Sequence, residues 1–229
     1  MPAPVAAAPS SDPQYAATDA PQTEIPSVRA QFAGKTVAVV PYVNKTLSEY
    51  RFLGDASVGI LPEYLLQAGF QPIESEKGDL KSILDELKYG QSDNVNPATA
   101  AQIGEHLGAR YVFIGEVNSY RVVTPKGDRG ISIAGFSLDS WGGQITYDIQ
   151  VSGRLVDVTT RAIVASKTVS HNQSFKATAG GLRTPWGSFR QSQGLTVENE
   201  VGAKILGVAL NRLVSGIVSQ LNARQVATN

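Results

Sequence analysis

Strict alternation of apolar and polar residues over positions 144–152 constrains the fold of this chain more than any other feature. The apolar residues occupy the odd positions: Ile145, Tyr147, Ile149 and Val151. Because successive side chains of a strand point to opposite faces, this pattern predicts a β-strand with one apolar and one polar face. Upstream, residues 131–138 also alternate, and their parity switches at Gly135 as it does at a β-bulge. The intervening residues 139–143 have turn chemistry, so the sequence predicts a first hairpin at about 121–152.

A second hairpin is predicted at about residues 172–198. The two faces of its first arm carry Phe175 and Ala177 on one side, and Lys176 and Thr178 on the other. A turn at residues 184–188 precedes a return arm over 189–197. Both hairpins are extensions that a small α+β domain does not need for its own core.

Two interpretations of the hairpins remain open. In the first, each hairpin packs one face on a soluble core, because any half-buried antiparallel strand alternates in this way. In the second, the arms span a membrane, for which strands of about 9–11 alternating residues suffice. Trp141 and Trp186 then sit at the turns, where aromatic side chains meet the membrane interface. Open strand edges are not tolerated in lipid, so this second interpretation requires a ring of identical chains.

The membrane interpretation assigns each face of the arms to a different environment. The lipid-facing side chains are Ile145, Tyr147, Ile149, Val151, Phe175 and Ala177. The lumen-facing side chains are Asp148, Gln150, Lys176 and Thr178. A charge near the bilayer midplane costs about 2–4 kcal/mol on the lipid side, and none of the residues assigned to lipid is charged.

Composition excludes several classes of protein. The chain has 229 residues with 20 basic and 20 acidic side chains, and this balance argues against nucleic-acid binding through phosphate contacts. It has no cysteine, so disulfides and thiolate metal sites are excluded. No apolar run approaches about 20 residues, so we expect no transmembrane helix.

The N-terminal segment, residues 1–34, is rich in Ala, Pro, Ser, Thr and Gln and has few large apolar side chains. Such a segment cannot bury enough surface to offset its ordering entropy, so we expect a flexible tail. A tether to a lipid anchor and a plain linker are equally compatible with it. Its start has neither the charged nor the apolar region of a signal peptide.

The patterns over residues 35–222 predict an α+β domain with helices on a mixed sheet, followed by a C-terminal tail at 223–229. Asn96 and Pro97 have the signature of a helix start, and Gly108 is the matching stop signal. The other predicted elements are a strand over 35–41, a helix capped by Asp55 and ended by Gly69, a strand over 71–75, a helix over 79–89, a strand over 110–117, an antiparallel pair over 151–158 and 162–169, and a long helix over 201–221.

No catalytic signature is present. The two histidines, His106 and His171, lack the spacing of a metal pair, and structural roles are expected for both. There is neither a P-loop nor a nucleophile elbow. We therefore expect no cofactor, no metal and no enzymatic activity, and a structural or transport role.

The order of segments in the chain resembles that of the curli-type outer-membrane secretion channel family, the CsgG-like lipoproteins. The segments that carry the resemblance are Thr36-Val-Ala-Val-Val-Pro41, Leu107-Gly-Ala-Arg-Tyr-Val-Phe-Ile-Gly-Glu-Val117, Val151-Ser-Gly-Arg-Leu-Val-Asp-Val-Thr159, Ser166-Lys-Thr168, residues 175–184, and Glu198-Asn-Glu-Val201. Two hairpin insertions at the membrane positions of the family accompany them.

The resemblance implies a homo-oligomeric ring of about nine subunits in the outer membrane of a Gram-negative bacterium. Each subunit adds two hairpins to one barrel, and its α+β domain lies in the periplasm. The ring exports unfolded protein subunits of surface fibres without nucleotide hydrolysis, and an accessory periplasmic factor can assist. Members usually carry a lipidated N-terminal cysteine, which this sequence lacks.

The loop after the first strand forms the constriction of the pore in this family, and residues 44–54 match it here. The candidate constriction residues are Asn44, Tyr50, Arg51 and Phe52. Phe52 is an equally good first core contact for the helix that follows. The loop is shorter than in the family, where an asparagine lies between the aromatic residues.

A soluble periplasmic lipoprotein is the alternative function. The same α+β core would then bind or regulate a partner without forming a pore. Hairpin length separates the two, because a soluble relative does not need long arms with outward apolar side chains.

Overall fold

The computed structural model describes residues 23–47, 50–73, 96–123, 143–178, 181–184, 187–189 and 195–224. The predicted helix over 79–89, the predicted strand over 131–138, and Trp141 and Trp186 lie outside these ranges. Most of both predicted tails also lies outside them.

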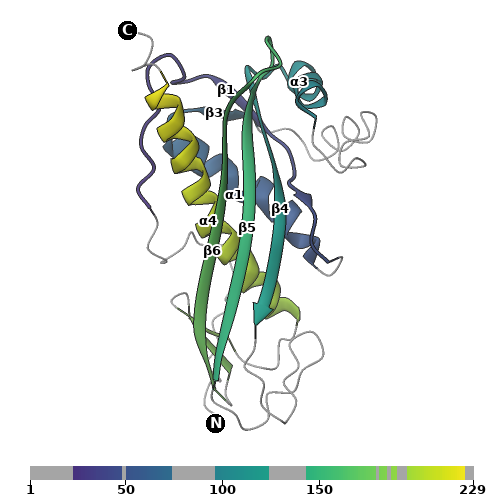
Figure 1. Cartoon of the computed structure of the whole chain (residues 1–229), viewed down its shortest axis with the longest axis vertical. Helices are drawn as coiled ribbons and strands as arrows, with labels where there is room; N and C mark the ends of the chain where they lie inside the picture. The colour runs from purple at the N-terminus through teal and green to yellow at the C-terminus, as the bar shows by residue number, and fades with distance from the viewer. Residues whose placement is uncertain are drawn as a thin grey trace, which may run out of the picture.

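The described strands form one mixed sheet of eight strands in the order β3-β1-β4-β5-β6-β7-β8, with β2 paired to β4. Figure 1 shows the long strands β4, β5 and β6 side by side. The strands are β1 (Thr36–Val39), β2 (Val43–Asn44), β3 (Gln71–Ile73), β4 (Tyr111–Val123), β5 (Gly143–Asp157), β6 (Ile163–Thr178), β7 (Gly181–Thr184) and β8 (Gly187–Phe189). Strand β1 runs parallel to both β3 and β4. From β4 to β8, each strand is antiparallel to the next. The α+β class with helices on a mixed sheet is thereby confirmed.

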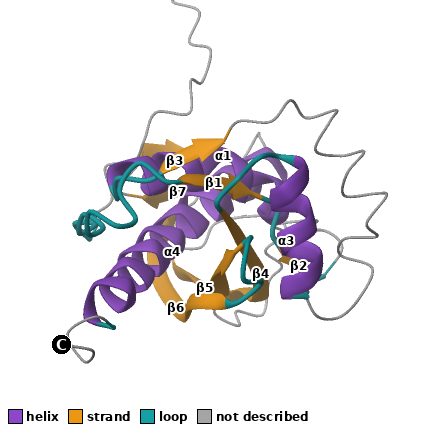
Figure 2. Ribbon diagram, turned by 90° about the horizontal axis from the view of Figure 1, so that it is seen from above, coloured by secondary structure: helices purple, strands orange, loops and turns teal. Residues whose placement is uncertain are grey.

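Helices cover both faces of this sheet. Helices α1 (Phe52–Gln67) and α4 (Leu195–Ala223) bury the larger core on one face, and α3 (Pro97–His106) buries a smaller core on the other. Figure 2 shows α4 between α1 and the long strands, and α4 contacts α1, β5 and β6. Alternation in β1 serves both cores, because Val37 and Val39 face the larger core while Ala38 faces the smaller one.

The long strands join segments that the sequence pattern separates. Strand β5 has 15 residues and β6 has 16, so the predicted pair over 151–158 and 162–169 is continuous with the second arm of the first hairpin and the first arm of the second hairpin. Their register runs from Gly143↔Ala177 to Leu155↔Ala165 and shifts only beyond Leu155. The hairpins therefore prolong core strands and are not separate additions to the domain.

A β-bulge at Asn118 allows β4 to keep its apolar side chains on one face. Val117 pairs with Val151 and Ser119 pairs with Gln150, which leaves Asn118 as the extra residue. Val117 and Tyr120 consequently face the same core although their positions differ by an odd number.

The end of the second hairpin differs from the prediction. Thr178 pairs directly with Gly181, so the chain reverses once before the predicted turn. Thr184 then pairs with Gly187, in agreement with a turn at 184–188. The return arm is short, because β8 ends at Phe189 and α4 begins at Leu195. The helical apolar pattern of α4 thus extends upstream into residues that were predicted as strand.

Helix ends follow their local signals unequally. The Asn96 side chain accepts a hydrogen bond from the Ala98 amide at 2.9 Å, with Pro97 at the first turn, as predicted. Gly108 follows α3 with a φ of 66°, a conformation that glycine adopts without strain. The expected cap at Asp55 is wrong: α1 begins at Phe52, and Asp55 lies in its first turn.

One described helical segment, Glu200–Ala223 of α4, is long and apolar enough to cross a membrane. However, 72% of it is buried inside the protein, where it packs on β5, β6 and α1. Core packing therefore accounts for its apolar composition, and the segment is weak evidence for a membrane span.

Candidate functional site: the loop after β1

The loop between β1 and α1 is bonded to the sheet at its start. Residues Val43 and Asn44 form β2, which pairs with Glu116 and Val117 of β4. The amide of Lys45 then donates to the carbonyl of Val117 at 3.0 Å. The backbone of this part of the loop is thus fixed by the sheet.

The Asn44 side chain closes the loop. Its Oδ1 accepts hydrogen bonds from the Thr46 amide at 2.9 Å and the Thr46 hydroxyl at 2.6 Å. Its Nδ2 donates to the carbonyl of Tyr50 at 2.8 Å. Since both ends of the amide are engaged within the loop, Asn44 shapes the loop and does not project from it.

Tyr50 and Phe52 turn toward the protein interior. The Tyr50 ring lies edge-on to Tyr120 with the centroids 4.8 Å apart, and both side chains belong to or pack on the larger core. Phe52 packs beside Gly202 of α4, where an added Cβ would come within 2.8 Å of the ring. Both side chains are half-buried, which agrees with the core contact considered for Phe52.

The exposed side chains of the described part of the loop are Lys45, Leu47 and Arg51. Leu47 is 66% exposed, and Arg51 is exposed at the N-cap of α1 without a side-chain capping bond. Of the four candidate constriction residues, the structure therefore brings Asn44 and Tyr50 together and leaves Arg51 facing solvent. The sequence pattern does not distinguish Leu47, because a single leucine in a polar loop has no periodic signal.

Tyr42 fixes the base of the loop from the core side of the sheet. Its ring occupies the space above Gly115, where any Cβ would overlap it, and its hydroxyl lies near Gly153. Gly115 and Gly153 are register partners in β4 and β5, so together they form a slot for the ring. Glycine inside a strand signals such a close approach, and the sequence offered this signal at both positions.

Hydrogen bonds link Tyr42 to the beginning of α1. The Tyr42 amide donates to the Ser57 hydroxyl at 3.1 Å, and that hydroxyl donates to the carbonyl of Gly54 at 2.6 Å. Gly54 itself lies so close to the Tyr42 carbonyl that a Cβ would be 2.6 Å from its oxygen. The loop is thereby connected at both of its ends to the same tyrosine.

An ion pair holds the loop from the opposite face of the sheet. Lys45 Nζ lies 3.0 Å from Oε2 of Glu116, whose side chain is only 9% exposed. Glu116 shares a shallow depression with Ser152 and Arg154 on that face. A lysine on the loop therefore neutralises a carboxylate that is otherwise buried at its base.

The apolar face of the hairpin strands is buried within the chain. Ile145, Tyr147, Ile149, Val151 and Phe175 are each at most 4% exposed and belong to the larger core with α4. This placement differs from the expected exposure to lipid, because α4 covers the face in the single chain. The side chains of Ala177 and Thr178 lie outside the described ones.

Aromatic side chains continue from the loop across this buried face. Tyr120 and Tyr147 have centroids 6.4 Å apart, and Tyr147 and Phe175 have centroids 5.6 Å apart. With Tyr50 at one end, the row crosses β4, β5 and β6 in turn. The loop is thus connected by packed rings to the strands of both hairpins.

The opposite face of the same strands is polar and open. Asp148 lies 3.4 Å from Arg121, and Gln150 donates to the Ser170 hydroxyl at 3.2 Å. Lys176 is exposed. These three residues assigned to a lumen therefore share the polar face of these strand segments, opposite the larger core.

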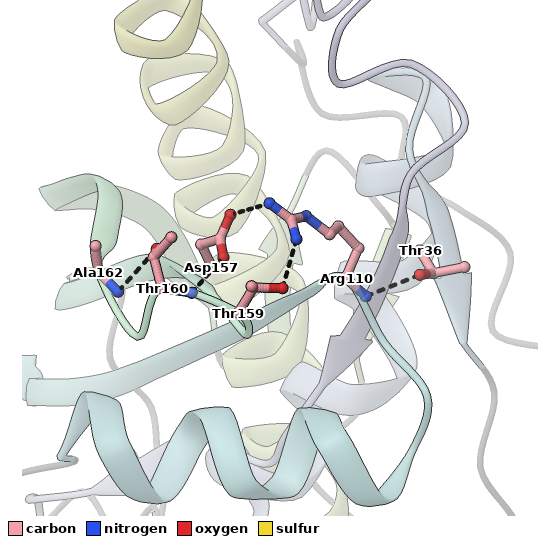
Figure 3. Close-up of polar contacts among 6 residues, drawn as sticks. All are labelled: Thr36, Arg110, Asp157, Thr159, Thr160 and Ala162. Carbon is pink, nitrogen blue, oxygen red and sulfur yellow. Dashed lines mark hydrogen bonds and ion pairs between the residues drawn. The ribbon is translucent and has the colours of Figure 1, made fainter.

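A second polar cluster lies at the β5–β6 turn and has a structural role (Figure 3). Arg110 contacts Asp157 at 2.6 Å and the Thr159 hydroxyl at 2.5 Å, and its amide donates to Thr36. Asp157 also accepts from the Thr160 amide at 2.9 Å. The cluster connects the turn to β1 and to the start of β4. The Arg110 guanidinium and the Asp157 carboxylate both have hydrogen-bond partners within it.

The two histidines occupy different environments, neither of which forms a metal site. His106 is exposed at the end of α3, whereas His171 is buried between β6 and α4. Burial lowers the pKa of His171 below its ordinary value; the hydrogen bond with Gln173 opposes this shift and the charge of Arg212 adds to it. Among the described residues, no three His, Asp or Glu side chains are grouped to hold a metal ion.

The architecture is thus an α+β domain in which a fixed loop and two prolonged hairpins share one sheet. Residues 13–229 match the family model described as curli production assembly/transport component CsgG. Because this match covers nearly the whole chain, the protein belongs to the CsgG family. No curated protein sequence matches the chain.

Several solved structures are similar to this chain at low identity. Lipoprotein GNA1162 from Neisseria meningitidis is 16% identical, with 61% of this chain and 83% of that chain covered and a TM-score of 0.41. The PelC dodecamer from Paraburkholderia phytofirmans is 17% identical, with 87% and 95% covered and a TM-score of 0.38. The LpoB C-terminal domain from Salmonella enterica is 17% identical, with 64% and 88% covered and a TM-score of 0.40.

Proposed function

We propose that this chain is the subunit of a homo-oligomeric outer-membrane channel that exports unfolded protein subunits by diffusion. The observation that carries the proposal is membership of a family of curli production assembly/transport components over residues 13–229. The proposed ring has about nine subunits, spans the outer membrane of a Gram-negative bacterium and keeps its α+β domains in the periplasm. It uses no cofactor and catalyses no reaction, and an accessory periplasmic factor assists it.

The two-faced strands support this proposal. Asp148, Gln150 and Lys176 lie on the open face, where charge stays hydrated in a water-filled lumen. The opposite face carries the apolar side chains that a barrel presents to lipid. In the single chain α4 covers that face, so insertion of these strand segments requires that they separate from α4.

A soluble periplasmic lipoprotein that binds a partner is the second candidate function. The specific observation that favours it is the burial of Ile145, Tyr147 and Ile149 under α4, because a sheet packed in this way has no need of lipid. In this alternative the hairpins are long but remain part of a monomeric domain.

Detergent extraction followed by electron microscopy and planar-bilayer recording tests the proposal. The channel predicts rings with a central hole and stepwise ion conductance. A matched control replaces residues 124–142 by a short Gly-Ser linker, which rejoins β4 to β5 near the pair Val123↔Thr146. The control should retain its helical circular dichroism but lose rings and conductance. A wild-type monomer in the detergent-free fraction, without conductance, would establish the second candidate instead.

A further inference from the structure

Strand β6 has a long edge that no other described strand pairs. Residues 163–175 of β6 pair with β5 on one side, whereas β7 begins to pair on the other side only at Lys176. Backbone amides and carbonyls on such an edge are a template onto which another chain can add a strand. Proteins therefore commonly cover an edge of this length or place charged side chains beside it.

Even-numbered residues of β6 direct their backbone groups to this edge. In an antiparallel strand the amide and carbonyl of one residue point to the same side, and the side alternates from residue to residue. The Ser166 amide and the Val164 carbonyl both bond to groups outside the sheet, which sets this parity. The amides and carbonyls of Thr168 and Ser170 consequently point to the same edge.

Two side chains of α4 occupy the start of the edge. Oε1 of Gln220 accepts a hydrogen bond from the Ser166 amide at 3.3 Å, and Nη1 of Arg224 donates to the Val164 carbonyl at 2.6 Å. A strand added at this point would supply one acceptor and one donor to the same two groups. Gln220 and Arg224 are four residues apart and so lie on one side of the helix. The two side chains thus take the place of a strand.

The same side of α4 continues along β6 beyond these two residues. Figures 1 and 2 show α4 and β6 side by side, and the two elements are in contact. At Gly216 an added Cβ would lie 3.2 Å from the stem of exposed Lys167, and Arg212 lies 3.1 Å from His171. The side chain of Lys167 adds a charge at the edge, as covered strand edges often do. The row on α4 is spaced by four residues, at positions 212, 216, 220 and 224.

We propose that the start of β6 is a strand-pairing surface for a second copy of this chain, and that Gln220 and Arg224 keep this surface closed. The surface is separate from the proposed channel, because it belongs to the α+β domain of each copy. While it is closed, copies cannot join through the edge of the core sheet. Association is thereby directed to other parts of the chain.

A second copy fits this edge because the edge is complementary to itself. Ser166, Thr168 and Ser170 have uncharged, exposed side chains on one face of the strand. Two antiparallel copies with Thr168 opposite Thr168 place Ser166 opposite Ser170 and Lys167 opposite Val169. No like charges then lie opposite each other, which would otherwise disfavour the pairing. The result is an isologous contact, in which the same surface serves both copies.

Disulfide formation between copies tests the proposal. The chain has no cysteine, so Thr168→Cys introduces a single thiol. In the paired register the two residues have their Cα atoms about 5.5 Å apart, within the span of a disulfide. Gln220→Ala with Arg224→Ala opens the edge, and mild oxidation should then give several-fold more disulfide-linked dimer than in the wild-type background. Non-reducing electrophoresis of the detergent-free chain measures the yield.

Matched variants identify the surface. Asn172→Cys is exposed on the same face of β6 but lies opposite Val164 in this register, so opening the edge should not raise its dimer yield. Gln220→Glu with Arg224→Lys retains an acceptor and a donor, so Thr168→Cys should stay as protected as in the wild-type background. Circular dichroism checks that each variant is folded, and Arg224→Ala alone replaces the double variant if that one unfolds.

The outcome does not depend on whether the chain conducts ions. Equal yields from Thr168→Cys with the edge open and closed would overturn the proposal, as would an equal rise for Asn172→Cys. A chain that shows the predicted cross-link but forms no pore would retain the β6 surface and lose only the channel.

Discussion

Arg212 Nη1 lies 3.1 Å from Nδ1 of His171, which connects α4 to the middle of β6. A guanidinium has only donors, so Nδ1 accepts this hydrogen bond and the ring proton belongs on Nε2. There it faces Oε1 of Gln173 at 3.2 Å. The contact therefore requires neutral His171 at the same interface that buries the apolar face of the hairpin strands.

Stability of the domain should fall as the pH decreases through about 6.5. The pKa of buried His171 is lowered in the folded chain, while in the unfolded chain it is about 6.5. Between these two values the unfolded state binds more protons, so the free energy of unfolding rises with pH there. The stability that His171 contributes is therefore lost as the pH falls toward its pKa in the folded chain. Urea denaturation at a series of pH values measures this dependence.

Histidine variants isolate that contribution. His171→Gln should remove this contribution, so the unfolding free energy of the variant should depend less on pH across this window than that of the wild type. His106→Gln is the control, because His106 is exposed at the end of α3. Equal pH dependence in His171→Gln and wild type would show that His171 does not titrate differently on unfolding.

The glycine slot should not tolerate a methyl group. A Cβ at Gly115 would overlap the Tyr42 ring, and overpacking of this kind typically costs about 1–3 kcal/mol. We expect Gly115→Ala to lower the urea midpoint. Gly59→Ala is the control: Gly59 is exposed on α1 with nothing within 4 Å of its Cβ position, so alanine should stabilise the helix by up to about 1 kcal/mol.

A double mutant links this cost to Tyr42. In the background of Tyr42→Ala the added methyl group has room, so the two substitutions should be less costly together than their sum. Additive effects would mean that the clash arises elsewhere in the core.

The Arg110–Asp157 contact should matter more than the Arg121–Asp148 contact. Asp157 is 8% exposed at its side chain and also accepts from the Thr160 amide, so Asp157→Ala leaves two donors without this acceptor and should cost about 1–3 kcal/mol. Asp148 and Arg121 have side chains that are 33% and 72% exposed, and Asp148→Ala should cost less than about 1 kcal/mol. Thermal unfolding of both variants measures this ranking. Indistinguishable melting temperatures would contradict it.

Local signals predicted the local parts of this fold well. Asn96 with Pro97 and the glycine at 108 marked the ends of α3, because caps depend only on neighbouring residues. The bulge at Asn118 carried no such signal, since its flanking residues include no glycine or proline.

Long-range packing could not be predicted in the same way. Alternation shows that Ile149 is on an apolar face, but α4, which covers that face, is distant in sequence. The position of Tyr42 depends on two glycines in β4 and β5, so the residues next to it in the sequence do not predict it. The exposed residues of the loop are therefore visible only once these contacts are known.

Neighbouring substitutions in β5 decide what covers the apolar face. Ile149 is fully buried in the core that α4 shares, so Ile149→Asp places a carboxylate without a partner in an apolar interior, at a cost of several kcal/mol. Gln150 is half-buried on the opposite face, where its only described side-chain hydrogen bond goes to Ser170, so Gln150→Asp should change stability by about 0.5 kcal/mol or less.

The measurements are urea denaturation of the detergent-free chain and the yield of detergent-extracted oligomer. If α4 covers the face before any membrane is met, Ile149→Asp should lose its cooperative unfolding transition and its oligomer together, while Gln150→Asp retains both. If Ile149→Asp instead unfolds with the wild-type midpoint and fails only to form the oligomer, then lipid alone buries this face, and the packing of β5 under α4 does not stabilise the free chain.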